Sequence, residues 1–122
     1  MVKHSITDIG GSVVKQDDRY VVKDNTTLTN LVLSSTNLNS DKQTSGHAHA
    51  GQEEVYIFVG GSGEMILIDT NGKHHDTPVT SGDIVLIPDG WFHRVCAGPD
   101  GCDFVCVFDG KRKPVDVHVR GH

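Results

Sequence analysis

The chain has 122 residues, a length that fits one domain and buries roughly two-thirds of the surface that the unfolded chain exposes. Lys and Arg total 11 against 16 Asp and Glu, and this acidic balance makes nucleic acid and acidic membranes poor partners. No stretch approaches the roughly 18 apolar residues of a membrane span, and the N-terminal stretch lacks the apolar run of a signal peptide. We therefore expect a cytoplasmic protein with a single domain over residues 1–122.

Short runs of β-branched and aromatic residues recur between clusters of Gly, Pro, Asn and Asp, whereas no window shows apolar residues at helical spacing. This pattern predicts an all-β fold of many short strands, which is typical of a sandwich or a barrel. The predicted strands cover residues 19–23, 28–36, 55–60, 64–69, 83–88, 92–97 and 103–109.

Two turns set the expected pairing of the later strands. Asn71-Gly72 tolerates positive φ at both central positions of a hairpin, so strand 64–69 is expected to pair with a strand at 73–79. The stretch 97–102 contains Pro and Gly and predicts a second hairpin, in which the strand of His93 pairs with the strand of Cys106.

The three cysteines, at positions 96, 102 and 106, are an odd number and give no closed disulfide framework. If Cys102 and Cys106 lie on one extended strand, about 13 Å separates them, which is beyond disulfide reach. We expect free thiols, in keeping with a cytoplasmic protein.

The stretch "GHAHAGQEEVY" at 46–56 contains a candidate metal site. His47 and His49 lie two residues apart, so on an extended strand both side chains point to the same side. Two imidazoles and a carboxylate suit a borderline divalent metal. Spacing alone leaves Glu53 and Glu54 open as the carboxylate, and a fourth ligand has to come from elsewhere in the chain.

A second stretch, "GDIVLIPDGWFHRV" at 82–95, completes a resemblance to the cupin superfamily. The first cupin motif, about 41–61 here, has His-x-His, three or four residues, Glu, six residues and Gly. The second motif, about 82–97 here, has Gly, five residues, Pro-x-Gly, two residues and His. The resemblance implies a jelly-roll β-barrel. Asp41 and Ala97 depart from it, since the family has Gly and Asn there.

The resemblance implies that His93 is one of the metal ligands, and the residues just before it support this assignment. Pro88 and the Asp89-Gly90 pair predict a turn after which His93 faces the barrel interior. Three imidazoles and one carboxylate give one divalent transition metal four protein donors and leave about two positions for water or substrate. The donor set suits Fe, Mn, Ni, Co and Zn alike.

Resemblance to the stretch that follows the ligand glutamate in the family also favours Glu54 over Glu53. From Glu54 the chain matches a ligand glutamate, alternating apolar residues and Gly-x-Gly-Glu at 61–64. In this register Tyr56 and Phe58 share the metal face, while Val55, Ile57 and Val59 lie on the other face. Gly51 allows the bulge that realigns the glutamate with the histidines. The predicted metal ligands are His47, His49, Glu54 and His93.

Tyr56 is a candidate acid or base, with a core tyrosine as the alternative, and Cys106 is a further inward candidate. Trp91 fits either the rim of a pocket or a hydrophobic plug. The remaining histidines follow a hairpin turn or lie near the termini, and we expect them to be solvated. These are His4, His74, His75, His118 and His122.

Three classes of function are compatible with these residues: a metal-dependent enzyme for a small polar substrate, a module that binds a sugar or small acid without turnover, and a structural metal protein. A site with open positions favours the enzyme over a structural role, because structural zinc normally has a closed site rich in cysteine. The resemblance permits oxygenase, isomerase, epimerase and lyase chemistry. It also implies a homodimer that pairs through sheet edges.

Overall fold

The computed structural model describes residues 3–110 and 115–118, and in these residues the only regular secondary structure is β. The described part of the chain contains no helix that is long and apolar enough to cross a membrane. The nine strands are β1 (Ser12–Gln16), β2 (Tyr20–Asn25), β3 (Leu31–Leu38), β4 (Ala48–Ala50), β5 (Glu54–Ile68), β6 (Thr77–Thr80), β7 (Ile84–Ile87), β8 (Phe92–Asp109) and β9 (Val115–His118).

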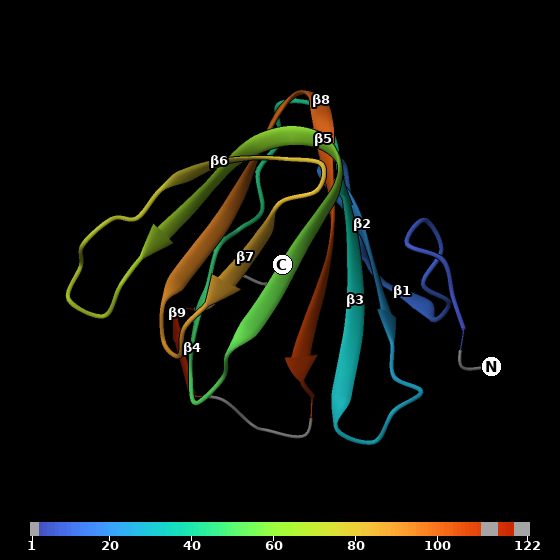
Figure 1. Cartoon of the computed structure of the whole chain (residues 1–122), viewed down its shortest axis with the longest axis horizontal. Coiled ribbons are helices and arrows are strands. Elements are labelled where there is room, and N and C mark those ends of the chain that lie inside the picture. The colour runs from blue at the N-terminus through green and yellow to red at the C-terminus, as the bar shows by residue number, and fades with distance from the viewer. Residues whose placement is uncertain (1–2, 111–114, 119–122) are drawn as a thin grey trace.

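Antiparallel pairing joins seven of these strands into one sheet in the order β1-β2-β3-β8-β5-β6, with β7 paired to the first half of β5. β4 and β9 pair with each other. Figure 1 shows that β5 and β8 arch together, so the sheet folds over and its inner faces meet. The predicted all-β, jelly-roll type of fold is confirmed.

Side-chain alternation decides which residues fill the interior. On β5, Tyr56 and Phe58 are buried, whereas Val55, Ile57 and Val59 are only half-buried on the opposite face. Inward side chains from β2, β3, β6, β7 and β8 join them in one core. The predicted facing of this strand is therefore correct, because residues two apart on a strand share a face.

Glycines allow β5 and β8 to bend as a pair. The register between them shifts between Phe58 and Gly60 and again between Gly61 and Gly63. Gly61 has φ +67°, and a Cβ there would lie 2.1 Å from the carbonyl oxygen of Gly101 on β8. The two backbones approach too closely for any larger residue at this point.

The hairpin predicted at 97–102 is wrong. The strands of His93 and Cys106 are two parts of β8, and both pair with β5 rather than with each other. Gly101 does adopt a positive φ, +76°, but it serves the bend of a continuous strand. Pro and Gly signal a departure from regular extended backbone, and they do not distinguish a bulge from a chain reversal.

The other predicted hairpin is confirmed with a shorter second strand. β5 and β6 are antiparallel, and the N–H of Gly72 donates to the carbonyl oxygen of Asp69 at the tip. β6 begins only at Thr77, because residues 69–76 form the loop. Predicted strands 55–60 and 64–69 are likewise one strand, β5.

A matched pair of substitutions tests the bend. Gly61→Ala should lower the free energy of unfolding by about 3 kcal/mol or more, because the added Cβ meets the backbone of Gly101. Gly82→Ala should cost only about 1 kcal/mol, because Gly82 also has a positive φ but faces open space. Urea unfolding measures both values, and equal costs would contradict the close approach at Gly61.

Candidate metal centre

The structure brings His47, Glu54 and His93 together inside the fold. One potential ligand atom from each side chain lies within 4.8 Å of the other two, and all three residues are buried. They come from three separate segments: the stretch before β4, the first residue of β5 and the second residue of β8. Two imidazoles and one carboxylate form a donor set that could hold a divalent metal ion.

Backbone pairing positions the two histidines. His47 and His93 form an isolated antiparallel bridge, with N–H to O distances of 3.1 Å and 3.0 Å in the two directions. Their rings meet edge to face, with centroids 4.4 Å apart. Gly46, with φ +82°, precedes this bridge, and a Cβ there would lie 2.6 Å from the ring of Phe92. Glycine at this position therefore lets the loop lie close to β8.

The imidazole of His93 has two different neighbours. Its Nδ1 lies 3.3 Å from the carbonyl oxygen of Trp91, and its Nε2 lies 3.1 Å from Oε2 of Glu54. A neutral ring that donates from Nδ1 to the carbonyl presents a lone pair at Nε2 toward the carboxylate. The lone pair of Nε2 and a lone pair of the carboxylate repel each other at this distance unless a cation or a proton lies between them.

The separation of these two atoms suits a metal ion. Ligand bonds of about 2.1 Å at right angles place two ligand atoms about 3.0 Å apart. The distance from Nε2 of His93 to Oε2 of Glu54 is close to that value, and both side chains are about 95% shielded from solvent. This distance is compatible with two ligands of one divalent ion, and the third donor lies within 4.8 Å of both.

The two glutamates of the first motif lie in different environments. Glu54 is 6% exposed and contacts His93, whereas Glu53 is exposed. His49 lies on β4, where its backbone pairs with Asp116 of β9, but its side chain lies outside the described residues. Of the four predicted ligands, the described side chains thus bring three together.

Tyr56 lies next to this cluster. Its ring is 4% exposed, meets His93 edge to face at 5.6 Å and stacks on Phe104 at 5.1 Å. Burial raises the pKa of the phenol well above its usual value, and the charge of Glu54 raises it further. The hydroxyl is therefore protonated at physiological pH and is able to donate a hydrogen bond, but it is not a base.

The thiol of Cys106 is a second buried group on the same inner face, opposite Tyr56 in the β5–β8 ladder. Burial raises its pKa far above the usual value, and the charge of Glu54 acts in the same direction. The three cysteines are free, as predicted. Cys106 remains a neutral thiol and behaves as a small core residue.

Two hydrogen bonds that the sequence did not predict fix the approach to Glu54. The N–H of Gly51 donates to Oδ1 of Asp89, which ties the loop before β5 to the turn before β8. Gln52 is buried, and its Nε2 donates to the carbonyl oxygen of Asp109 at 3.0 Å. Gly51 has a positive φ, +85°, and lies in the turn between β4 and β5, where no strand pairing tests the predicted bulge.

Trp91 is partly buried and packs against the core. It also stacks on His75 at 4.7 Å. His75 and His74 are exposed, as predicted, and each contacts a carboxylate, Asp69 and Asp76 respectively.

A family model described as Cupin matches residues 7–118. The chain belongs to the cupin family. This assignment agrees with the two motifs. Asp41, where the resemblance implies glycine, adopts φ 60°, a conformation that glycine adopts more readily.

Solved structures similar to this cupin include oxalate decarboxylases of two bacteria. A deletion mutant of the Bacillus subtilis enzyme superposes with a TM-score of 0.77 at 21% identity, over 95% of this chain and 31% of that chain. The Lactobacillus farciminis enzyme in a formate complex gives a TM-score of 0.73 at 17% identity, over 87% of this chain and 32% of that one. These similarities show the shared fold.

A curated relative gives a closer but shorter sequence match. It is an acireductone dioxygenase of Gluconacetobacter diazotrophicus, 40% identical over 58 residues, which are 48% of this chain and 31% of the relative. The cupin thus spans about a third of the length of the proteins that it matches.

The three thiols should differ in reactivity. Burial raises the pKa of Cys102 to about 11, so only about 0.1% of it is thiolate at pH 8, whereas Cys96 is less buried. We expect a disulfide reagent to titrate one thiol quickly in the native protein and three after unfolding. Cys96→Ser should remove the fast phase; three thiols that react at one rate would contradict the burial of Cys102 and Cys106.

Proposed function

We propose that this cupin, a single domain over residues 1–122, is a metal-dependent enzyme that acts on a small polar substrate in the cytoplasm. One divalent transition metal, Fe, Mn, Ni, Co or Zn, would be held by His47, His49, Glu54 and His93. The observation that carries the proposal is the buried approach of His93 Nε2 to Glu54 Oε2 at 3.1 Å. A carboxylate at that depth is costly unless a cation compensates its charge.

The surroundings of the donors support catalysis more than a structural role. The three described donors are two imidazoles and a carboxylate, whereas structural zinc sites are usually closed and rich in cysteine. When bound, the ion would supply Lewis acidity and, if it is iron, activation of oxygen. Four protein donors would leave room for substrate oxygen atoms beside them.

The residues of the chain would orient and shield the substrate. Tyr56, which keeps its proton, would donate a hydrogen bond to a substrate oxygen beside His93. The stacked ring of Phe104 makes the inner side of the site apolar and limits the entry of water. The carbonyl of Trp91 would hold the imidazole of His93 in one tautomer.

Oxygenase chemistry is the first reaction class to test. The support for it is the 40% identity, over 58 residues, to a protein named acireductone dioxygenase. Isomerase, epimerase and lyase reactions use the same kind of metal site, and we include them as further reaction classes to assay. The oxalate decarboxylases share only the fold with this chain, so a small carboxylic acid is the second substrate class to assay.

Binding without turnover is the alternative function, and one observation favours it. Tyr56, which packs on His93 and is not itself a predicted ligand, has a pKa raised well above the usual value. A protein that only captures a sugar or a small acid needs hydrogen-bond donors of this kind and no general base.

Substitution of the ligands should separate the two glutamates. Glu54→Gln should reduce metal affinity at least 100-fold, because the site loses its charge, and His47→Ala, His49→Ala and His93→Ala should each strongly reduce metal content. Glu53→Gln is the matched control and should change little, since Glu53 is exposed. Elemental analysis and chelator competition measure the effect, while circular dichroism checks that each variant remains folded. Loss of metal from the Glu53 variant alone would show that the other register is correct.

Turnover should depend on the same carboxylate. Protein purified without added metal, and then loaded with Fe(II), should consume oxygen when a small hydroxyketone or enediol is added. The Glu54→Gln variant should lose this oxygen uptake and the Glu53→Gln variant should retain it. Saturable binding of these compounds without product would favour the alternative function. A protein that neither binds metal nor a small molecule would contradict both.

A further inference from the structure

The turn that precedes β8, residues 88–91, connects the metal centre to a hairpin loop on the surface. We call it the ligand turn, because the carbonyl oxygen of its last residue, Trp91, lies 3.3 Å from Nδ1 of His93. Its second residue, Asp89, accepts a hydrogen bond from the N–H of Gly51 in the loop that leads into β5. The position of the ligand turn therefore bears on His93 and on the approach to β5.

The backbone of the ligand turn holds Trp91 only loosely. The N–H of Trp91 donates to the carbonyl oxygen of Pro88 at 3.3 Å, which is longer than the usual range for such a bond. Gly90, which precedes Trp91, has a positive φ of +78°, and glycine lets the backbone rotate at little steric cost. The direction of the Trp91 carbonyl then depends on how the side chain of Trp91 is held.

The side chain of Trp91 is held by the core and by the hairpin loop, residues 69–76. Its ring packs against the core, and it stacks on the imidazole of His75 with centroids 4.7 Å apart and an interplanar angle of 27°. The same two segments also meet at Gly90, where a Cβ would lie 3.4 Å from the methyl group of Thr70. The hairpin loop thus lies against the ligand turn at two neighbouring positions.

His75 is itself fixed through its backbone and its ring. Its N–H donates to the carbonyl oxygen of Leu67 at 2.8 Å, and its Nε2 lies 2.9 Å from Oδ2 of Asp69. The other carboxylate oxygen of Asp69 accepts hydrogen bonds from the N–H groups of Asn71 and Lys73. These bonds, the one with His75 first, hold the pKa of Asp69 below its usual value. The ring that the loop presents to the ligand turn is therefore held in one orientation.

We propose that His75 is a positioning residue for the metal centre: its ring holds Trp91, and the carbonyl of Trp91 holds the imidazole of His93 with Nε2 toward the metal. This inference rests on the proposed metal function. His75 is not one of the three clustered donors, and its Nε2 is engaged by Asp69. Partners that orient a ligand imidazole through its other nitrogen are known to tune metal affinity, and His75 acts one contact behind such a partner.

The neighbouring His74 provides an internal comparison. It also pairs with a carboxylate, since its Nδ1 lies 3.1 Å from Oδ2 of Asp76. Its side chain is 58% exposed, against 38% for His75. Among the ring contacts of the described residues, it is His75 that stacks on Trp91. A substitution at position 74 therefore disturbs the same loop without removing the stack.

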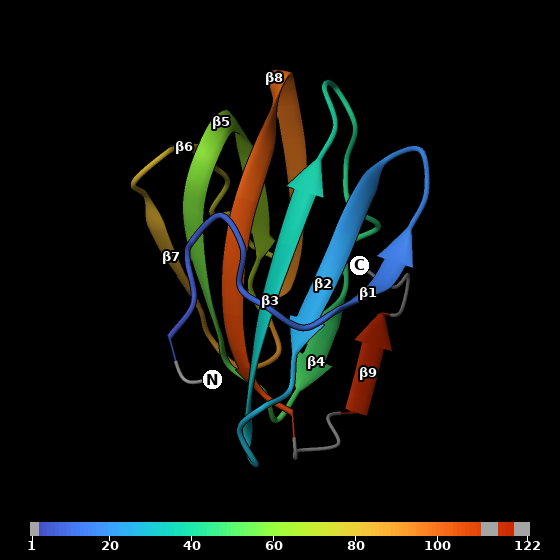
Figure 2. The same cartoon turned by 90° about the vertical axis from the view of Figure 1, so that its right-hand side faces the viewer.

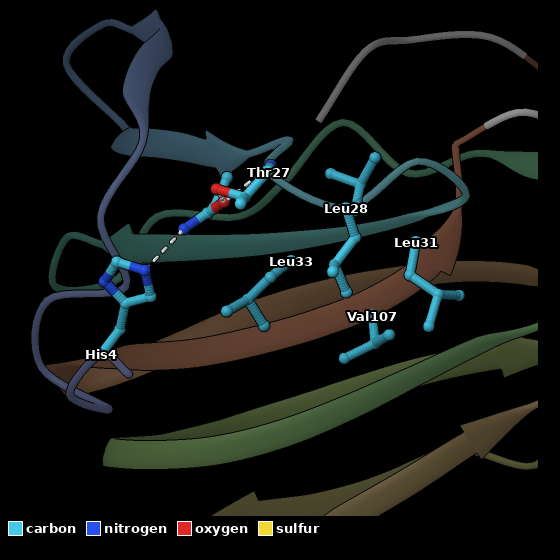
Figure 3. Close-up of a pocket in the computed structure, with 8 residues that line it drawn as sticks. His4, Thr27, Leu28, Leu31, Leu33 and Val107 are labelled. Carbon is cyan, nitrogen blue, oxygen red and sulfur yellow. Dashed lines mark hydrogen bonds between the residues drawn. The ribbon is translucent and has the colours of Figure 1, made fainter. Parts of the chain in front are cut away.

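A second comparison comes from another part of the fold. β6 and β1 lie at opposite ends of the strand order, and Figure 2 shows them on opposite sides of the molecule. β3, between them, borders a groove of about 280 Å³, and Figure 3 shows Leu28, Leu31 and Leu33 around it. Among the described residues, the lining of this groove shares none with the ligand turn or the hairpin loop. Leu33→Ala should therefore destabilise the fold without reaching the metal centre.

Metal affinity is the first measurement. His75→Ala should weaken Co(II) binding about tenfold and shift the visible absorption bands of the bound ion, which report the orientation of its ligands. His75→Phe keeps an aromatic ring against Trp91 and should restore both properties. His74→Ala and Leu33→Ala should leave both unchanged. Chelator competition measures the affinity, and urea unfolding of each variant separates this effect from a loss of stability.

A second measurement needs no metal. NMR of the metal-free protein follows the proton on Nδ1 of His93, whose exchange with water is slowed by the bond to the carbonyl of Trp91. His75→Ala should speed this exchange about tenfold, because the ligand turn opens more often, whereas His75→Phe and His74→Ala should not. Trp91 is the one tryptophan of the chain, so a change in its fluorescence confirms that the stack is lost in His75→Ala.

The outcomes distinguish this inference from the proposed function. Equal exchange rates in the unmodified protein and in His75→Ala, a His75→Phe variant that behaves like His75→Ala, or an equal effect of His74→Ala would overturn the positioning role. An unmodified protein that binds no metal would contradict the proposed function instead, and the exchange rates would still decide whether His75 positions His93.

Discussion

The bend of the β5–β8 pair is the constraint on which the metal centre depends. Glu54 pairs with Phe108 at one end of this ladder, and His93 pairs with Leu67 at the other. In a straight ladder the 13 steps between positions 54 and 67 would span about 44 Å. The atoms that face each other are 3.1 Å apart. The donors can meet only because both strands fold over together at their glycines.

The bend also explains how the fold tolerates a buried carboxylate. Glu54 is the first residue of its strand, so its charge lies at the end of the apolar interior rather than in the middle. Tyr56 and Phe104 stack directly behind it and exclude water from that side. Desolvation of this kind raises the pKa of Tyr56 and of Cys106, while the facing imidazoles of His47 and His93 favour a bound cation.

Alternation along β5 predicted which of its residues face inward once the register was chosen. The choice of Glu54 over Glu53 and the inclusion of His93 came from the resemblance to the cupin motifs, with the turn at Pro88 in agreement for His93. The hairpin at 97–102 was wrong because Gly101 serves a bend and not a reversal. The contacts of Asp89 and Gln52 could not be predicted, because their backbone partners lie 38 and 57 residues away and depend on the finished bend.

Several strands of this sheet are more apolar than packing of the core alone requires. An antiparallel strand with one solvated face alternates apolar and polar residues, whereas one that is covered on both faces is apolar throughout. The runs at 55–59, 84–87 and 104–108 are apolar without a polar interruption. Their inward residues line the core and the metal centre, which accounts for an apolar residue at every second position. The positions between them, Val55 and Leu86 among them, face outward, and Leu86 is 70% exposed, so packing of the core does not account for their apolar character.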